Sequence, residues 1–248
     1  MNAINKALDI FELFLNSEDD LSIKQVSEKT RISYPTVHRI TSILVNRGYF
    51  LQTGKRGKYS VHPAKLSEYI GVIKSKLNIR TVALPYMNDL SQTVNEAVLL
   101  AICRGYVAIT VDVVNRGRLL NITPDTDTPG LYYTGTGKIF LANMSDKEFL
   151  SYLDNTNLLP KTSNTITDKN ELIKNINEVR CTGIAFDDEE TESGLRSVAA
   201  PIRDWDRKVV AAISIIGPTS RINKSRLNEL AAITKEYALR ISQTMGAQ

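Results

Sequence analysis

The amino-acid sequence predicts an α+β protein with two domains and a helical connector between them, at residues 1–61, 79–248 and 62–78 respectively. Length gives the first reason, because 248 residues exceed the ~100–200 that one domain usually contains. Hydrophobic periodicity gives the second, since helical spacing dominates the N-terminal part and long β-branched runs begin later. Charge gives the third: residues 31–65 carry +7 with no acidic side chain, whereas residues 1–30 sum to −3.

The N-terminal part begins with two expected helices. Apolar residues recur at helical spacing over residues 4–16, which predicts an amphipathic helix. Ser22, followed three residues later by Gln25, forms a capping-box pattern. The second helix is therefore expected to start at Ser22 and to extend to about Lys29.

A third helix and a hairpin follow. Ser33 is expected to cap the third helix, and Pro35 is tolerated in its first turn. Gly48 stands in the terminating position. Two short β-type runs, residues 49–51 and 58–61, are joined by a basic, glycine-flanked loop, and this pattern predicts a β-hairpin.

Three helices with a short turn between the second and third, followed by a basic hairpin, are typical of a winged helix-turn-helix domain. The third helix of such a domain enters the major groove, where its first turns reach base edges, while basic side chains of helix and wing contact phosphates. The expected partner is an operator in double-stranded DNA, palindromic if the protein is a dimer. The residues expected to contact it are Ser33, Tyr34, Thr36, His38, Arg39, Arg47, Lys55, Arg56 and Lys58.

The C-terminal part mixes helices with strands. Residues 62–78 predict the connector helix, and residues 79–94 a further helix that contains Pro85. Two β-branched runs separated by Arg104 and Gly105 predict a hairpin. Further helices are expected at 137–143, 146–155, 168–181 and 222–245, and strands at 183–186, 196–203 and 208–217. Hairpin-connected strands with flanking helices predict an α+β domain.

Short motifs occur along the chain in a fixed order: TVHRI at 36–40, TGTGKIFLA at 134–142, VRCTGIA at 179–185, GLRSVAAP at 194–201 and AAISIIGP at 211–218. By their order and spacing, the chain resembles IclR-type transcriptional regulators over essentially its full length. The resemblance implies a GAF-like effector domain with an antiparallel sheet, and a homodimer or dimer of dimers. It also implies a regulator, more often a repressor than an activator, that responds to a metabolite.

The resemblance also implies which residues hold the effector. Carried over position by position, they are Gly135, Thr136, Asp187, Ser197 and Ser214. Ser197 stands where the family often has cysteine, and Ile216 where it often has serine. These two departures bear on the identity of the effector.

The segment from Thr134 to Gly137 indicates the chemistry of the effector. Backbone N–H groups at a helix N-terminus, with hydroxyls beside them, bind anionic groups such as carboxylates. A small organic acid is therefore expected, with a plain helix-capping turn as the alternative interpretation. The acidic run at 187–190 would either accept hydrogen bonds from ligand hydroxyls or form a solvated loop.

The sequence argues against catalysis. A serine or cysteine nucleophile needs a histidine base, and the two histidines, His38 and His62, lie in or beside the first domain. The sequence contains neither a phosphate-binding glycine motif nor zinc-ligand spacing. No enzyme activity, cofactor or metal is expected. The alternative of an enzyme with an accessory DNA-binding domain rests on paired carboxylates within 187–190.

A second alternative is a ligand-responsive adaptor whose winged helix binds protein. It differs in salt dependence, because only a DNA complex releases condensed counterions. No run approaches the ~20 apolar residues of a membrane helix, and the N-terminus lacks a signal-peptide pattern. Cys103 and Cys181 are expected as buried thiols of a reducing compartment, so the chain is expected to act in the cytoplasm without a membrane partner.

Overall fold

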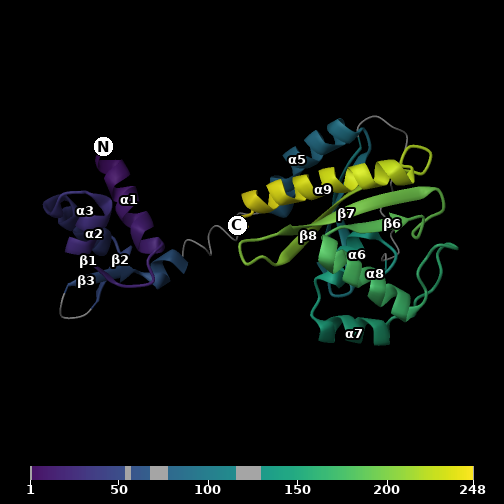
Figure 1. Cartoon of the computed structure of the whole chain (residues 1–248), viewed down its shortest axis with the longest axis horizontal. Coiled ribbons are helices and arrows are strands. Elements are labelled where there is room, and N and C mark those ends of the chain that lie inside the picture. Colours follow the sequence, from purple (N-terminus) through teal and green to yellow (C-terminus); the bar gives the residue numbers. More distant parts are fainter. Residues whose placement is uncertain (1, 54–56, 68–77, 116–129, 248) are drawn as a thin grey trace. The chain divides into compact units, whose positions relative to one another are not determined.

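The structure, a computed structural model, describes residues 2–53, 57–67, 78–115 and 130–247. Its contacts divide the chain into two compact units (Figure 1). The first unit spans residues 1–76 and the second unit residues 77–248. Of the expected connector, residues 68–77 lie outside the described part of the chain.

The first unit contains the three expected helices, the expected hairpin and one further strand. The helices are α1 (Ala3–Leu15), α2 (Ile23–Thr30) and α3 (Tyr34–Asn46). The strands are β1 (Leu21–Ser22), β2 (Phe50–Thr53) and β3 (Lys58–Val61), in the antiparallel order β1-β3-β2. The sequence did not predict β1, because two residues are too few to show an alternating pattern.

Local hydrogen bonds fix the start of α2 and the turn that follows it. The expected capping box is confirmed: Gln25 donates its backbone N–H to Ser22 Oγ at 3.3 Å, and Ser22 donates its own to Gln25 Oε1 at 2.9 Å. Arg31 takes the left-handed conformation, with φ of 57°, at the end of α2. Ser27 Oγ then donates to the carbonyl of Ile32 at 2.6 Å. These bonds set where α3 can begin.

The second unit is built on a five-stranded antiparallel sheet of order β5-β4-β8-β7-β6. The strands are β4 (Ala97–Arg104), β5 (Val107–Val114), β6 (Ala185–Asp188), β7 (Leu195–Arg203) and β8 (Val209–Pro218). The helices are α5 (Ile79–Val94), α6 (Gly135–Ala142), α7 (Asp146–Asn155), α8 (Lys169–Thr182) and α9 (Lys224–Thr244). The α+β class is confirmed, and α6 begins two residues earlier than predicted.

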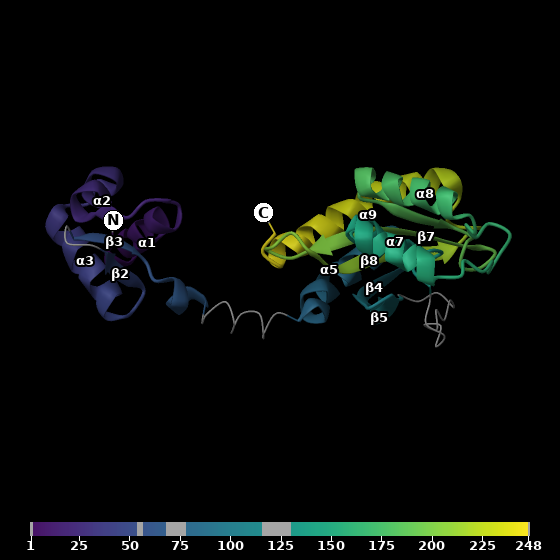
Figure 2. The ribbon, with the colours of Figure 1, turned by 90° about the horizontal axis from the view of Figure 1, so that it is seen from below.

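The two faces of this sheet differ in side-chain size. Helices α5 and α9 cover one face, where Val98, Ile213 and Ile215 are fully buried (Figure 1). Seen from below, α5 lies beside β4 and β5 (Figure 2). Helices α6, α7 and α8 belong to the other core, to which the sheet contributes small side chains such as Ala199 and Ala212. Small side chains allow α6 to lie close to the strands.

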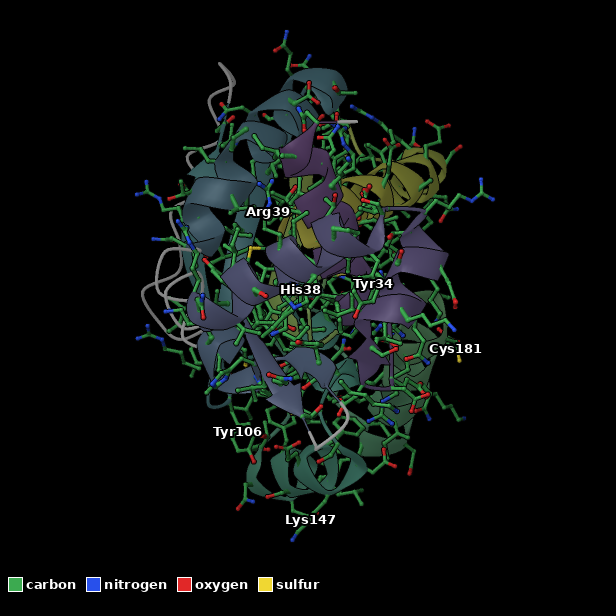
Figure 3. The ribbon with its side chains drawn as sticks, turned by 90° about the vertical axis from the view of Figure 1, so that its left-hand side faces the viewer. Tyr34, His38, Arg39, Tyr106, Lys147 and Cys181 are labelled. Carbon is green, nitrogen blue, oxygen red and sulfur yellow. The ribbon has the colours of Figure 1, made fainter. Side chains whose placement is uncertain are left out.

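The two cysteines lie at different depths. Cys103, near the end of β4, is half-buried, whereas Cys181, in the last turn of α8, is exposed (Figure 3). The expectation that both thiols are buried is therefore wrong for Cys181. Val179, two residues before Cys181, is buried on the inner face of α8, whereas the cysteine itself lies on the outer face.

A buried carboxylate joins the start of the sheet to α9. The side chain of Glu96 is 1% exposed. It accepts hydrogen bonds from Arg221, including one from Nη2 at 2.7 Å, and from Arg226 Nη1 at 3.2 Å. Arg226 Nη2 also donates to the carbonyl of Val94 at 2.7 Å. A buried charge is tolerated when it is paired in this way.

Glu96→Gln is expected to lower the free energy of unfolding by about 2 kcal/mol, because it leaves two guanidinium groups without their anion. The loss stays below the ~3–5 kcal/mol typical of fully buried pairs, since both arginines are partly solvated. Urea denaturation measures the change. Asp154→Asn is the control, because the Asp154–Lys169 pair is exposed and contributes at most ~1 kcal/mol. Equal stability of the two variants would contradict this assignment.

Candidate functional site

One side of α3 is packed and the other is exposed. Val37, Ile40 and Thr41 are buried in the first unit. Tyr34 and His38, one helical turn apart, and Arg39 are exposed (Figure 3). Tyr34 is 53% exposed, so packing does not account for this large aromatic side chain. The face that the sequence assigned to base edges is therefore free to make contacts.

The start of α3 differs from expectation in one respect. Ser33 holds the N-cap position, but its side chain makes no cap hydrogen bond. Its carbonyl instead accepts the N–H groups of Thr36 and Val37, at 2.9 and 3.0 Å. The hydroxyls of Ser33 and Thr36 lie 2.9 Å apart. The expected side-chain cap is therefore wrong, and both hydroxyls stand together at the start of the helix.

The remaining expected DNA contacts lie at two other places. Arg47 is exposed just after α3, where it lines a shallow hollow of about 440 Å³ together with Lys65 and His62. Lys58 is exposed at the first position of β3. Lys55 and Arg56 lie outside the described residues. The first unit thus exposes described cations at the end of α3 and on the hairpin.

In the second unit, the candidate ligand site begins at the N-terminus of α6. Thr134 caps this helix by accepting the N–H of Gly137 at 3.0 Å. Among the described residues, the N–H groups of Gly135 and Thr136 have no acceptor. Every residue of α6 is buried. Two amide donors therefore point from a buried helix end, where the helix dipole favours an anion.

The glycines of this segment are needed for packing. A Cβ on Gly135 would lie 2.9 Å from Ser197 Oγ, and one on Gly137 would lie 2.4 Å from the carbonyl oxygen of Leu131. Residues with a side chain would push α6 away from β7 and from the preceding turn. The glycines therefore fix the distance between helix and sheet, a role that the local sequence did not indicate.

The strands bring the other expected ligand contacts to α6. Asp187 pairs with Ser197 across β6 and β7, and Ser214 pairs with Ala199 across β8 and β7. Ser197 and Ala199 are two residues apart, so they share one face of the sheet. Ala199 belongs to the α6 core. All five expected positions are therefore gathered between the N-terminus of α6 and the sheet.

Asp187 already has partners within the fold. Its Oδ1 accepts the backbone N–H groups of Glu190 and Thr191 at 2.8 and 3.2 Å, and its Oδ2 accepts Thr191 Oγ1 at 2.7 Å. Burial raises the pKa of Asp187, and these hydrogen bonds act against the rise. Asp187 therefore closes the loop after β6 and has few lone pairs left for a ligand.

A buried ion pair beneath α6 was missed by the sequence reasoning. Lys138, 1% exposed, donates from Nζ to Glu190 Oε1 at 2.5 Å and to the carbonyl of Phe186 at 3.1 Å. Glu190 Oε2 is buried and has no hydrogen-bond partner among the described residues. Burial raises the pKa of Glu190 to about 7, although Lys138 opposes the rise.

The rest of the acidic run is also paired. Arg196 Nε binds Asp188 Oδ1 at 2.5 Å, and its Nη2 binds Glu189 Oε1 at 3.2 Å. Each of the four carboxylates therefore has a partner within the fold, so the run is not a solvated loop. A run of four acids signals charge, but their partners are set by the fold.

The raised pKa of Glu190 predicts a pH dependence of stability. Between its ordinary value of 4.5 and about 7, the folded chain holds a proton that the unfolded chain has lost. The free energy of unfolding should therefore fall as pH rises through this range, by about 3 kcal/mol. Glu190→Gln cannot titrate and should lack this component. Denaturant unfolding from pH 5 to 8 compares the two proteins, and parallel profiles would contradict the assignment.

A winged helix-turn-helix unit and a separate α+β unit with a buried polar site define a DNA-binding regulator with an effector domain. Two family models match the chain: the IclR helix-turn-helix domain over residues 3–54 and the bacterial transcriptional regulator IclR C-terminal domain over residues 72–243. The chain belongs to the IclR family of transcriptional regulators. This confirms the resemblance drawn from the sequence motifs.

Individual relatives agree with this assignment. The regulator KipR of Bacillus subtilis is 30% identical, with 97% of this chain and 96% of the relative covered. The acetate operon repressor of Salmonella typhimurium is 27% identical, with 99% and 90% covered. Among solved structures, the IclR protein of Thermotoga maritima is 30% identical, with a TM-score of 0.64 and 99% of both chains covered.

The family decides between the function classes weighed from the sequence. Its members are transcriptional regulators that bind DNA, so the expectations of a DNA partner and of no enzyme activity are confirmed. The alternatives of an adaptor and of an enzyme fall away. In the described part of the chain, no helix combines the length and apolar composition of a membrane span.

Proposed function

We propose that this chain represses transcription by binding a palindromic operator through residues 1–61, and that a small organic acid bound in residues 79–248 controls that binding. Residues 62–78 connect the DNA-binding part to the effector-binding part. DNA is the partner of the first part, so the proposed place of action is the cytoplasm. The single observation behind the choice of effector is the pair of unpartnered amides at the buried N-terminus of α6.

The proposed operator contacts follow from exposure and position on α3. Tyr34 and His38 are exposed near its start, where a recognition helix meets base edges. The hydroxyls of Ser33 and Thr36 lie beside them. Exposed Arg39 is placed for phosphates. Arg47, Lys58 and the wing residues Lys55 and Arg56 complete the proposed phosphate-binding set.

The proposed effector contacts combine charge and hydrogen bonding. The amides of Gly135 and Thr136 bind one carboxylate, and the positive end of the α6 dipole favours its charge. Thr136 Oγ1 and Ser197 Oγ have no hydrogen-bond partner among the described residues and supply donors. Ser214 lies on the same face of the sheet as Ser197 and borders the ligand. Asp187 acts on the site through the loop that it closes.

Calorimetric titration of the full-length protein tests the effector class. The panel consists of small mono- and dicarboxylic acids, each paired with its amide. At least one acid is expected to bind, and its amide is expected not to, since an amide carries no charge for the helix N-terminus. Binding by neutral or cationic compounds alone would refute the organic-acid effector.

A homodimer is supported by α1. Ile4, Leu8 and Leu15 are 69%, 53% and 51% exposed, and their four- and seven-residue spacing places them on one side of the helix. A second copy of the same helix offers a self-complementary partner. Leu8→Glu should lower the molar mass measured by analytical ultracentrifugation, whereas the exposed control Lys174→Gln should not. Unchanged mass in Leu8→Glu would exclude α1 as the interface.

A further inference from the structure

A second hollow lies in the second unit, at the other end of α6. It has a volume of about 360 Å³ and is lined by Cys103, Phe140 and Val209 together with the end of the β7–β8 hairpin. The volume falls within the ~300–1,000 Å³ range typical of small-ligand sites. Ser197 lies near the start of β7 and Arg203 is its last residue. Six residues of extended strand separate them, which is about 20 Å. The second hollow is therefore separate from the proposed effector site.

Three cations line this hollow: Arg203, Arg207 and Lys208. Within the described ranges, no carboxylate forms an ion pair with any of them. The nearest acids in the sequence are Asp204, which is buried and accepts the N–H groups of Asp206 and Lys208, and Asp206, which is exposed. The hollow therefore keeps an excess of positive charge.

The guanidinium group of Arg203 is held in place by the fold. Its Nη1 donates to the carbonyl of Arg207 at 2.9 Å, and its Nη2 donates to Asn143 Oδ1 at 2.8 Å. A guanidinium has five N–H donors, so further donors remain for a ligand. The two hydrogen bonds fix the direction of the remaining N–H donors. A guanidinium held in this way can bind both oxygens of a carboxylate. Phe140 and Val209 offer an apolar surface beside it.

We propose that this basic hollow binds a second organic anion, one with a carboxylate and an apolar body, such as an aromatic acid. The cations neutralise the carboxylate, and the apolar wall covers the ring. The ligand stands at the opposite end of α6 and β7 from the proposed effector. Both ligands would therefore contact α6 and β7. Each ligand would favour one position of α6 relative to β7.

Cys103 provides a local probe of occupancy. The chain has two cysteines, so full-length Cys181→Ser reacts only through the thiol that lines the hollow. Burial raises the pKa of Cys103, and alkylation by iodoacetamide at mildly alkaline pH is read by mass spectrometry. Benzoate at about ten times its dissociation constant should slow this alkylation about tenfold, since only unoccupied protein reacts. Benzamide, uncharged and of the same shape, should not slow it.

Two variants in the same Cys181→Ser protein locate the effect. Arg207→Gln with Lys208→Gln should lose protection by benzoate, because exposed cations are removed and the packing is kept. Lys147→Gln with Lys174→Gln, an equal charge change at exposed positions of α7 and α8, should keep it. Thr136→Val, at the proposed effector site, should keep it as well.

The outcomes that overturn the proposal are distinct. Equal protection by benzamide would show that charge is irrelevant, and this comparison needs no substitution besides Cys181→Ser at an exposed position. Protection that survives the loss of Arg207 and Lys208, or that disappears in Thr136→Val, would place benzoate elsewhere. Protection by duplex DNA without protection by benzoate would assign the cations to nucleic acid.

Discussion

Arg39→Ala is expected to weaken operator binding about 100-fold and to leave effector affinity unchanged. Arg39 is exposed on α3, away from the buried side of that helix. A hydrogen bond to a charged group is worth about 1.5–3 kcal/mol. The proposed dimer would lose two of them, or about 3 kcal/mol, which corresponds to about 100-fold in affinity. Fluorescence anisotropy of a labelled operator, selected from fragmented genomic DNA by binding, measures the change.

Salt dependence separates a lost phosphate contact from a lost fold. Each neutralised phosphate contributes about 0.9 to the slope of log affinity against log salt, so Arg39→Ala should have a slope about 1.8 shallower if the protein binds as the proposed dimer. Lys174→Ala removes the same charge from an exposed position of α8 and should leave the slope unchanged. An Arg39→Ala protein with the wild-type slope, or with weakened effector binding, would show that the interface is misplaced.

Thr136→Val combined with Ser197→Ala is expected to lower effector affinity about 100-fold with little change in stability. The two hydroxyls would donate to the ligand carboxylate, and two such bonds are worth about 3 kcal/mol. Within the described structure neither hydroxyl has a protein partner, so the fold loses no hydrogen bond. Calorimetric titration measures affinity, and urea denaturation measures stability.

Asp187→Ala provides the contrast to this double variant. It removes an acceptor of two backbone N–H groups and one hydroxyl, so it should lower stability by about 2 kcal/mol or more. If the double variant kept wild-type effector affinity, the organic acid would not be bound between α6 and β7. If Asp187→Ala were as stable as the wild type, the loop would not depend on this carboxylate.

The first unit was predictable because its determinants are local. The capping box at Ser22 and Gln25 and the helical spacing each depend on residues within one or two turns. Two features of the first unit were not predicted correctly, the capping of α3 and the strand β1. Ser33 has the residue type of a cap, but Pro35 has no N–H to donate and the N–H of Thr36 bonds to the Ser33 carbonyl instead of its hydroxyl. The strand β1 exists only because β3 returns beside it.

The second unit was predictable in its elements but not in its polar contacts. Lys138 and Glu190 are separated by 52 positions, and Glu96 lies 125 positions from Arg221. Residue type alone cannot select such partners from many charged side chains. The motif around Gly135 did indicate a helix N-terminus, because such an end is a local feature. Which residues lie beneath it depends on the sheet.

Operator affinity measured as a function of effector concentration tests the central claim most directly. With an acid found by calorimetry, full-length wild-type protein should change its operator affinity by about 5–150-fold, the usual size of coupling between two sites. The midpoint of this change should move to higher acid concentration in Thr136→Val with Ser197→Ala and should stay in place in Arg39→Ala. An operator affinity that does not respond to any bound acid, or a midpoint that Arg39→Ala moves instead, would contradict the account.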